Sequence, residues 1–187
     1  LKRARDYAET RADGIISLAV AQDALKLHEI DGSKENNVVI PGIIGGCAVW
    51  IDPNAPPEHR YKTQAKVYPS REFHMHSSPD GLRWKQFARL NPGRGGWDTQ
   101  SVAFWDPNIK RYALYTRYWM SHRHGTAKAP DNFRTVRRLE SDDLKSWHKQ
   151  GIVMQPDEAD RTLHPTPPGQ PPVDYYGADV FRYAEAD

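Results

Sequence analysis

The sequence predicts an all-β protein made of repeated four-stranded antiparallel units. A turn centred on an aspartate recurs at Asp23, Asp80 and Asp143, with a small residue two positions before it and a large apolar residue four positions after it. These aspartates lie 57 and 63 positions apart (80 − 23 and 143 − 80). Self-similarity at such a period indicates an array of supersecondary units. The 15 Pro and 13 Gly, which separate short apolar runs, also favour many turns and strands.

A second motif recurs in phase with the first. Residues 48–53 (Ala-Val-Trp-Ile-Asp-Pro) match residues 102–107 (Val-Ala-Phe-Trp-Asp-Pro) 54 positions later, and a basic run with a tyrosine follows each copy. In the complete unit, apolar and alternating runs predict strands at residues 46–51, 61–67, 71–77 and 85–88. Four strands with short connections form an antiparallel meander of the size of one propeller blade, with the first strand innermost.

The repeats predict that the chain forms one partial propeller domain, which consists of about two and a half blades. We expect the end of a blade at residues 1–44, full blades at 45–96 and 97–172, and the start of a further blade at 173–187, with its first strand at 179–183. The second full copy carries about twelve extra residues, roughly 119–132, between its second and third strands. Both ends of the chain look like cuts through a repeat.

Composition and charge set limits on the partners. The 26 basic and 24 acidic residues are mixed along the chain and give a net charge of only +2, so we expect no nucleic-acid partner. No run of about 18 apolar residues is present, which argues against a membrane span. Cys47 is the single cysteine, which excludes an internal disulfide framework. We expect no cofactor.

Candidate site residues lie just before the predicted inner strand at residues 102–107. Propellers gather the ends of their inner strands around an axial channel, so polar residues at this point are site candidates. Asp98 and Gln100 alternate and would point to the same side, beside Trp97, whose ring can stack on a sugar face. The alternative for Asp98 is that it caps its own turn.

The order of motifs resembles a known group of proteins. Residues 97–100, 105–107, 112–117 and 138–147 together are similar to the five-bladed β-propeller glycoside hydrolases, closest to proteins related to the N-terminal domain of glycoside hydrolase family 32 and more distantly to family 43. The resemblance implies five blades and a secreted or periplasmic location. It also implies three acids: a first-blade nucleophile, a second-blade Asp that orients the sugar, and a third-blade Glu that donates a proton. Asp98 matches the second.

The chain departs from that pattern at the other two acids. No acid precedes the strand at Cys47, so a first-blade nucleophile would lie upstream of Leu1. No Glu stands before residues 179–181, where Asp174, Tyr175 and Tyr176 occur instead. Asp174 is therefore a candidate for the missing acid, and Tyr176 for a nucleophile or proton donor. Stacking on sugar, chiefly by Tyr175, or plain packing is the alternative for the tyrosines.

Further residues have a chemistry suited to ligand binding. Arg117 and Arg137 can present guanidinium groups to a carboxylated or sulfated sugar. His122 and His124 lie in the insertion, which should overhang the end of the blade that carries Asp98. Each pair of alternating histidines, at residues 74 and 76 and at 122 and 124, could share a zinc ion, but no acidic cluster accompanies either pair, and no metal is expected.

These observations predict a carbohydrate-active propeller that hydrolyses glycosidic bonds of an oligo- or polysaccharide, with part of its acid set outside the segment. A glycan-binding propeller that lacks the catalytic acids is one alternative. A structural or protein-interaction propeller is another. In each case the remaining blades, from the same or another chain, are the expected partners.

Overall fold

The computed structural model describes residues 26–44, 47–68, 72–90, 99–121, 132–163, 165 and 173–181. Its described part is predominantly β and contains two antiparallel sheets, as predicted. The first sheet consists of β1 (Ile43–Ile44), β2 (Val49–Ile51), β3 (Tyr61–Val67), β4 (Glu72–Ser78) and β5 (Lys85–Leu90). The second consists of β6 (Val102–Asp106), β7 (Arg111–Ser121), β8 (Asn132–Ser141) and β9 (His148–Met154). A 3-10 turn, η2 (Pro57–His59), and a short helix, α2 (Glu158–Leu163), complete the elements.

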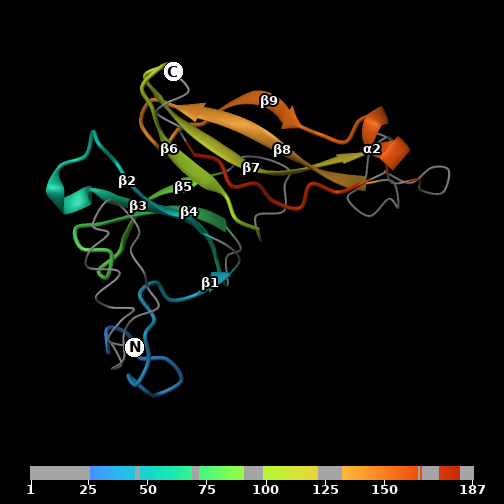
Figure 1. The fold of residues 1–187 in the computed structure, drawn as a ribbon. Helices are drawn as coiled ribbons and strands as arrows, with labels where there is room; N and C mark the ends of the chain where they lie inside the picture. The colour runs from blue at the N-terminus through green and yellow to red at the C-terminus, as the bar shows by residue number, and fades with distance from the viewer. Residues whose placement is uncertain are drawn as a thin grey trace, which may run out of the picture.

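Both sheets are meanders. The second runs in the order β6-β7-β8-β9, and in the first β3-β4-β5 follow one another while β1 and β2 both pair with β3. Figure 1 shows the second sheet above the first, with β6 next to β2 and β3. The four strands predicted for the complete unit are confirmed as β2, β3, β4 and β5.

The core lies between the sheets. Strand alternation directs one face of each sheet toward the other, and large apolar side chains fill the space, among them Phe73, Met75, Leu114 and Leu139, each at most 1% exposed. Polar contacts between described residues also cross the interface. The amide of Gln64 donates to the Ser101 carbonyl, and the hydroxyl of Tyr112 donates to the carboxylate of Asp52.

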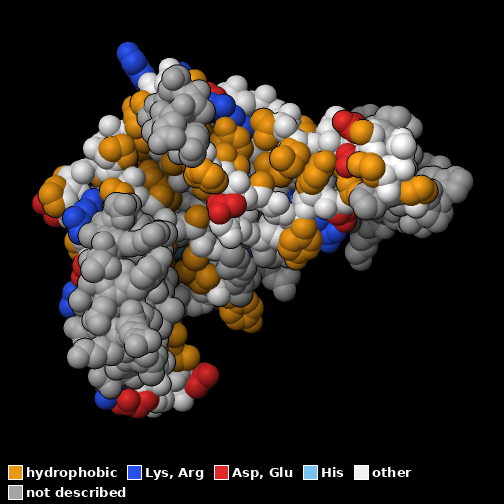
Figure 2. Space-filling view, viewed as in Figure 1, with side chains coloured by type: hydrophobic (Ala, Val, Ile, Leu, Met, Phe, Trp, Pro, Cys, Tyr) orange, Lys and Arg blue, Asp and Glu red, His pale blue; other side chains and the backbone are white. Residues whose placement is uncertain are grey.

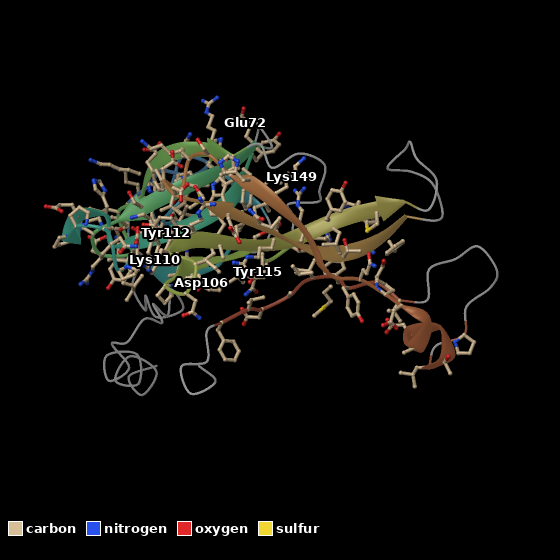
Figure 3. The ribbon with its side chains drawn as sticks, turned by 90° about the horizontal axis from the view of Figure 1, so that it is seen from above. Glu72, Asp106, Lys110, Tyr112, Tyr115 and Lys149 are labelled. Carbon is tan, nitrogen blue, oxygen red and sulfur yellow. The ribbon has the colours of Figure 1, made fainter. Side chains whose placement is uncertain are left out.

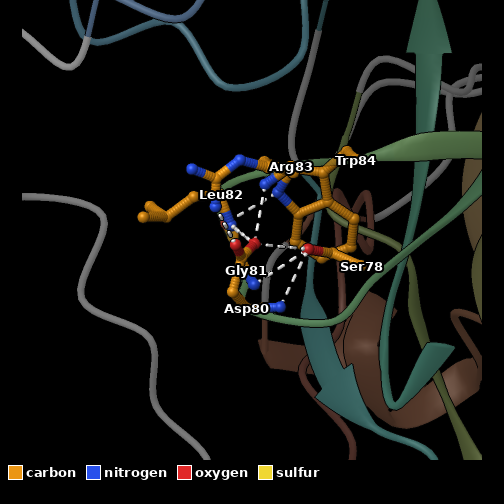
Figure 4. A network of polar contacts seen from close by, with 6 residues as sticks. All are labelled: Ser78, Asp80, Gly81, Leu82, Arg83 and Trp84. Atoms are coloured by element: carbon orange, nitrogen blue, oxygen red, sulfur yellow. Dashed lines mark hydrogen bonds and ion pairs between the residues drawn. The ribbon is translucent and has the colours of Figure 1, made fainter. Parts of the chain in front are cut away.

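The recurring aspartate is a structural turn residue, as its sequence context predicts. Asp80 Oδ1 accepts hydrogen bonds from the backbone N–H groups of Leu82 (2.9 Å) and Arg83 (2.8 Å), and Trp84 Nε1 donates to the Gly81 carbonyl at 2.7 Å beneath the turn (Figure 4). Burial raises the pKa of Asp80, but the hydrogen bonds from Arg83, Leu82 and Ser78 outweigh it and lower this pKa to about 2.

The second copy has the same architecture. Asp143 Oδ1 accepts from the backbone of Lys145 (2.8 Å) and Ser146 (2.7 Å), and Trp147 Nε1 donates to Leu144 O at 3.2 Å. The Asp23 copy lies outside the described residues. Because the motif satisfies backbone groups in a tight turn, its recurrence reflects local folding rather than catalysis.

Replacing Asp80 with alanine is expected to lower the unfolding free energy by about 1 kcal/mol, since loss of a side-chain cap on backbone N–H groups has a cost of this order. Urea denaturation at pH 7 measures the change. Arg83→Ala is the matched control, because it removes only an exposed ion pair with Asp80, whose contribution is small. Equal losses in the two variants would show that the backbone hydrogen bonds are not what the carboxylate contributes.

Two predicted features differ in the structure. The strand expected at residues 179–183 is not formed over its described part, residues 179–181. Instead, residues 173–181 form an irregular segment, which we call the crossing segment, that lies against the second sheet (Figure 1). The predicted insertion begins later than expected, because β7 continues to Ser121 and β8 starts at Asn132. No helix in the described ranges has the length and apolar character needed to cross a bilayer.

Candidate functional site

The structure describes some of the predicted site residues and not others. Trp97, Asp98, His122 and His124 lie outside the described residues. Gln100 lies within them, and its amide donates to Asp179 Oδ1 in the crossing segment at 3.4 Å. The residues just before β6 are thus in contact with the segment that carries the other candidates.

The second sheet has two chemically different faces. Leu114 and Leu139 are paired in register and face the first sheet. Strand alternation places Arg117 and Trp119 on the opposite, outer face, where Trp119 is paired with Arg134 of β8. In Figure 2 hydrophobic side chains gather over the second sheet. Figure 3 shows Asp106, Lys110 and Tyr112 close together at the turn between β6 and β7.

Two arginines and two aromatic rings converge on the outer face. The guanidinium carbon of Arg134 lies 4.3 Å from the ring centre of Trp119 and 5.0 Å from that of Tyr176. The guanidinium carbon of Arg117 lies 5.4 Å and 5.1 Å from the same two rings. We call Arg117, Trp119, Arg134 and Tyr176 the arginine–aromatic cluster. Arg117 is only 3% exposed, whereas Tyr176 is 59% exposed.

The crossing segment binds β8 at the point where β9 has ended. The pairing of β8 with β9 extends toward the start of β8 only as far as Val136. The backbone groups of β8 at Arg134 therefore bond to the crossing segment and not to β9. The Arg134 N–H donates to Asp174 Oδ1 at 2.7 Å, and the Tyr175 N–H donates to Arg134 O at 3.2 Å. The guanidinium of Arg134 also forms an ion pair with Asp174 Oδ2. Asp174 therefore uses both carboxylate oxygens on one residue.

The tyrosine side chains beside Asp174 have different surroundings. The hydroxyl of Tyr175 donates to the carboxylate of Asp160 in α2, at 3.3 Å and 3.4 Å. Desolvation, and then the charge of Asp160, raise the pKa of Tyr175. A raised pKa opposes formation of a phenolate nucleophile, and the carboxylate of Asp174 is engaged by Arg134.

Arg137 lies apart from the cluster. It is paired with Thr116 and faces the interior side of the second sheet, while Arg117 faces outward. Its guanidinium carbon lies 4.8 Å from the ring centre of Tyr118, and burial lowers its pKa to about 10. Arg117 and Arg137, which the sequence suggested as joint binders of an acidic sugar, therefore lie on opposite faces of the second sheet.

The alternating histidines of β4 are buried in the first sheet. The ring centres of His74 and His76 lie 6.1 Å apart, and His74 Nε2 lies 3.0 Å from Glu72 Oε2. Within the described ranges, no group of three or more His, Cys, Asp or Glu side chains is arranged to hold a metal ion.

Two members of the cluster were not among the predicted site residues. Trp119 fell at the edge of the predicted insertion, and Arg134 belongs to a run of arginines typical of a solvated strand face. The signal that could have found them is the register of β7 and β8, which pairs Trp119 with Arg134 and places Arg117 two residues away on the same face. Register depends on where the loop begins, and the repeat alone did not fix that position.

Comparison with known proteins gives a short match only. Over 31 residues, 17% of the chain, it is 61% identical to the Holliday junction branch migration complex subunit RuvB of Nocardioides sp., and 61% identical over 31 residues to RuvB of Acidothermus cellulolyticus. The chain spans 9% and 8% of the length of these two relatives. No family model matches the chain. The match is shorter than either described sheet, so it assigns no family to the β structure.

The expected membership of the five-bladed glycoside hydrolases is therefore wrong. No family model supports it, and the curated proteins that the chain matches include RuvB subunits from four organisms. The motifs behind the resemblance, such as residues 78–84, have a local structural explanation, because their side chains cap the backbone of a turn.

Proposed function

We propose that this chain is a glycan-binding segment of a β-propeller, in which the arginine–aromatic cluster holds the sugar. The observation that carries the proposal is the position of the exposed Tyr176 ring beside Trp119 and two guanidinium groups on the outer face of the second sheet. Aromatic rings stack on the apolar faces of sugars, and guanidinium groups donate hydrogen bonds to sugar oxygens.

The contacts within the cluster favour binding over plain core packing. Trp119 is half-buried and Tyr176 is largely exposed, so aromatic surface is available to a ligand. The two arginines hold the rings from the protein side, which limits the side-chain entropy that a ligand must remove on binding. A pre-arranged aromatic and cationic surface of this kind suits an oxygen-rich ligand with an apolar ring face.

The propeller arrangement is part of the proposal and rests on the equivalence of the repeats. Trp50 and Met75 of the first sheet lie in the interface with the second sheet. Their repeat equivalents are Phe104 (50 + 54) and Arg138 (75 + 63), which lie on the outer face of the second sheet. If the units stack in one direction, a following sheet packs on the part of that face around Phe104 and Arg138, as in a propeller. The cluster, farther along β7 and β8, then stays open to a ligand.

The same proposal has a catalytic version, in which the protein also hydrolyses the bound glycan and Asp98 takes part in the reaction. Within the described residues, Asp174 is paired with Arg134 and Tyr175 with Asp160, so neither is available as an unpaired acid. An Asp98→Asn substitution is expected to abolish turnover of an oligosaccharide. The affinity of the variant for that oligosaccharide should stay within about twofold of the affinity of the unsubstituted protein. Turnover that survives the substitution, measured by release of reducing ends, would remove Asp98 from the reaction.

The binding proposal predicts that Trp119→Ala weakens glycan affinity at least tenfold, since a sugar–aromatic stack of about 1.4 kcal/mol or more would be lost. Isothermal titration with neutral and uronic acid oligosaccharides measures the affinity. Tyr68→Ala is the matched control, because Tyr68 is an exposed aromatic residue, 61% accessible, at the end of β3 in the other sheet. The Tyr68→Ala variant should bind the oligosaccharides with the same affinity as the unsubstituted protein.

Two results would contradict the binding proposal. One is the absence of saturable binding to any oligosaccharide, which would favour a structural or protein-interaction propeller. The other is binding to a four-way DNA junction without binding to sugar. The junction is included as a probe because the matched RuvB proteins are subunits of a Holliday junction branch migration complex.

A further inference from the structure

We infer that the guanidinium and backbone N–H of Arg134 form a carboxylate site for a uronic acid residue, and that Asp174 of the crossing segment occupies this site until the ligand displaces it. The inference rests on the proposed glycan-binding function and names its ligand class and its regulation. It concerns residues of β8 and of the crossing segment that are all described in the structure.

The geometry at Arg134 defines the class of ligand. Asp174 Oδ1 accepts from the Arg134 backbone N–H at 2.7 Å, and Oδ2 pairs with Nη1 of the same residue. Two donors, each facing one oxygen of a single group, match a planar carboxylate. The ring of Trp119, on β7 and outside the crossing segment, flanks the same guanidinium, so a carboxylate carried on a sugar ring would also meet aromatic surface.

The contact made by Asp174 can be replaced. Its side chain is 36% exposed and that of Arg134 is 26% exposed, and ion pairs open to water contribute little net stability. The crossing segment is held to the sheet by non-covalent contacts that include Tyr175 N–H to Arg134 O, Gln100 to Asp179, and the Tyr176 ring on two guanidinium groups. An external carboxylate therefore competes with a weakly bound internal one.

The inference predicts opposite effects for two substitutions in the full chain. Asp174→Asn removes the competing charge and should strengthen binding of a galacturonic acid trimer about three- to tenfold. Arg134→Gln should weaken it at least tenfold. Asp179→Asn is the control, since Asp179 lies in the same segment but contacts Gln100, and it should leave the affinity unchanged. Thermal melting of each variant checks that the fold is retained.

A second measurement follows the crossing segment directly. The Tyr175 amide donates to Arg134 O, so displacement of the segment should speed its hydrogen exchange when the trimer is added. A neutral galactose trimer should bind through the rings without this change, and a sulfated trimer should bind less tightly than the uronate.

The outcomes separate this inference from the proposed function. If neutral sugars bind through Trp119 but Asp174→Asn does not raise uronate affinity, the carboxylate site is wrong and glycan binding stands. If the sulfated trimer binds as tightly as the uronate, the cluster attracts negative charge in general and the assignment to carboxylate is wrong. If no sugar binds to any variant, both proposals fail.

Discussion

Replacing Asp52 with alanine is expected to lower the unfolding free energy by about 3–5 kcal/mol, because it leaves a buried lysine without its counter-ion. Asp52 follows β2, and its side chain is 3% exposed. Oδ2 lies 3.2 Å from Lys62 Nζ, whose side chain is 6% exposed. Chemical denaturation at pH 7 measures the loss.

The same carboxylate connects the two sheets. The hydroxyl of Tyr112, on β7 of the second sheet, donates to Asp52 Oδ1 at 3.1 Å and reaches Oδ2 at 3.2 Å. Burial raises the pKa of Tyr112; a hydrogen bond with Asn54 opposes this, and the charge of Asp52 adds to it, so that the net shift is upward. Lys62 also donates to the His59 carbonyl, which fixes the ammonium group in place. Removing the carboxylate therefore leaves the buried ammonium group without its counter-ion and takes away the Asp52 acceptor of the Tyr112 hydroxyl.

The repeat supplies a matched control. Asp106 is the equivalent of Asp52 (52 + 54), and each accepts a 3.0 Å hydrogen bond from the backbone N–H two residues later. Asp106 is more exposed and lies 3.7 Å from Arg138, so Asp106→Ala should cost about 1 kcal/mol or less. Equal losses in the two variants would mean that the turn bond, not the buried pair, sets the cost.

A double variant tests the mechanism further. Replacing Asp52 with alanine and Lys62 with methionine together removes both charges and should recover part of the loss, since a buried ion pair can be exchanged for apolar groups at little cost. If the double variant is less stable than Asp52→Ala alone, the lysine contributes in some way other than as an unpaired buried charge.

Much of the fold could be predicted because its signals are local. Alternation and turn chemistry predict β3 at residues 61–67, where the structure has it. They predict β5 from residue 85, where it begins. The Ser78 and Asp80 turn forms its hydrogen bonds within seven residues, from 78 to 84. Contacts of this range depend on neighbouring side chains alone, so the sequence pattern determines them.

The arginine–aromatic cluster could not be predicted in the same way. It joins Trp119, Arg134 and Tyr176 from two strands and the crossing segment, so it depends on the register of β7 with β8. A shift of one residue would move each strand side chain to the other face. Residues 179–183 resemble the predicted inner strands, which predicts a strand there, yet a strand needs a partner that supplies ladder hydrogen bonds. The crossing segment instead contacts Gln100.

Lowering the pH from 7 to 5 is expected to remove about 2 kcal/mol of stability through His76. The side chain is 5% exposed. Burial, and then the nearby charge of His74, lower its pKa to about 4, whereas an unfolded histidine titrates near a pKa of about 6.5. Between these values the unfolded chain binds more protons than the folded chain. Stability is therefore fully present above pH 6.5 and falls as the pH drops toward 4.

The His76→Gln variant separates this effect from the titration of other groups. It should be nearly insensitive to pH between 7 and 5 in thermal melts, because the side chain no longer takes up a proton on unfolding. His148→Gln is the control, since His148 lies at the exposed start of β9 and should keep the pH dependence of the unsubstituted protein. If His76→Gln loses as much stability at pH 5 as that protein, the acid sensitivity arises elsewhere and His76 is not buried in its neutral form.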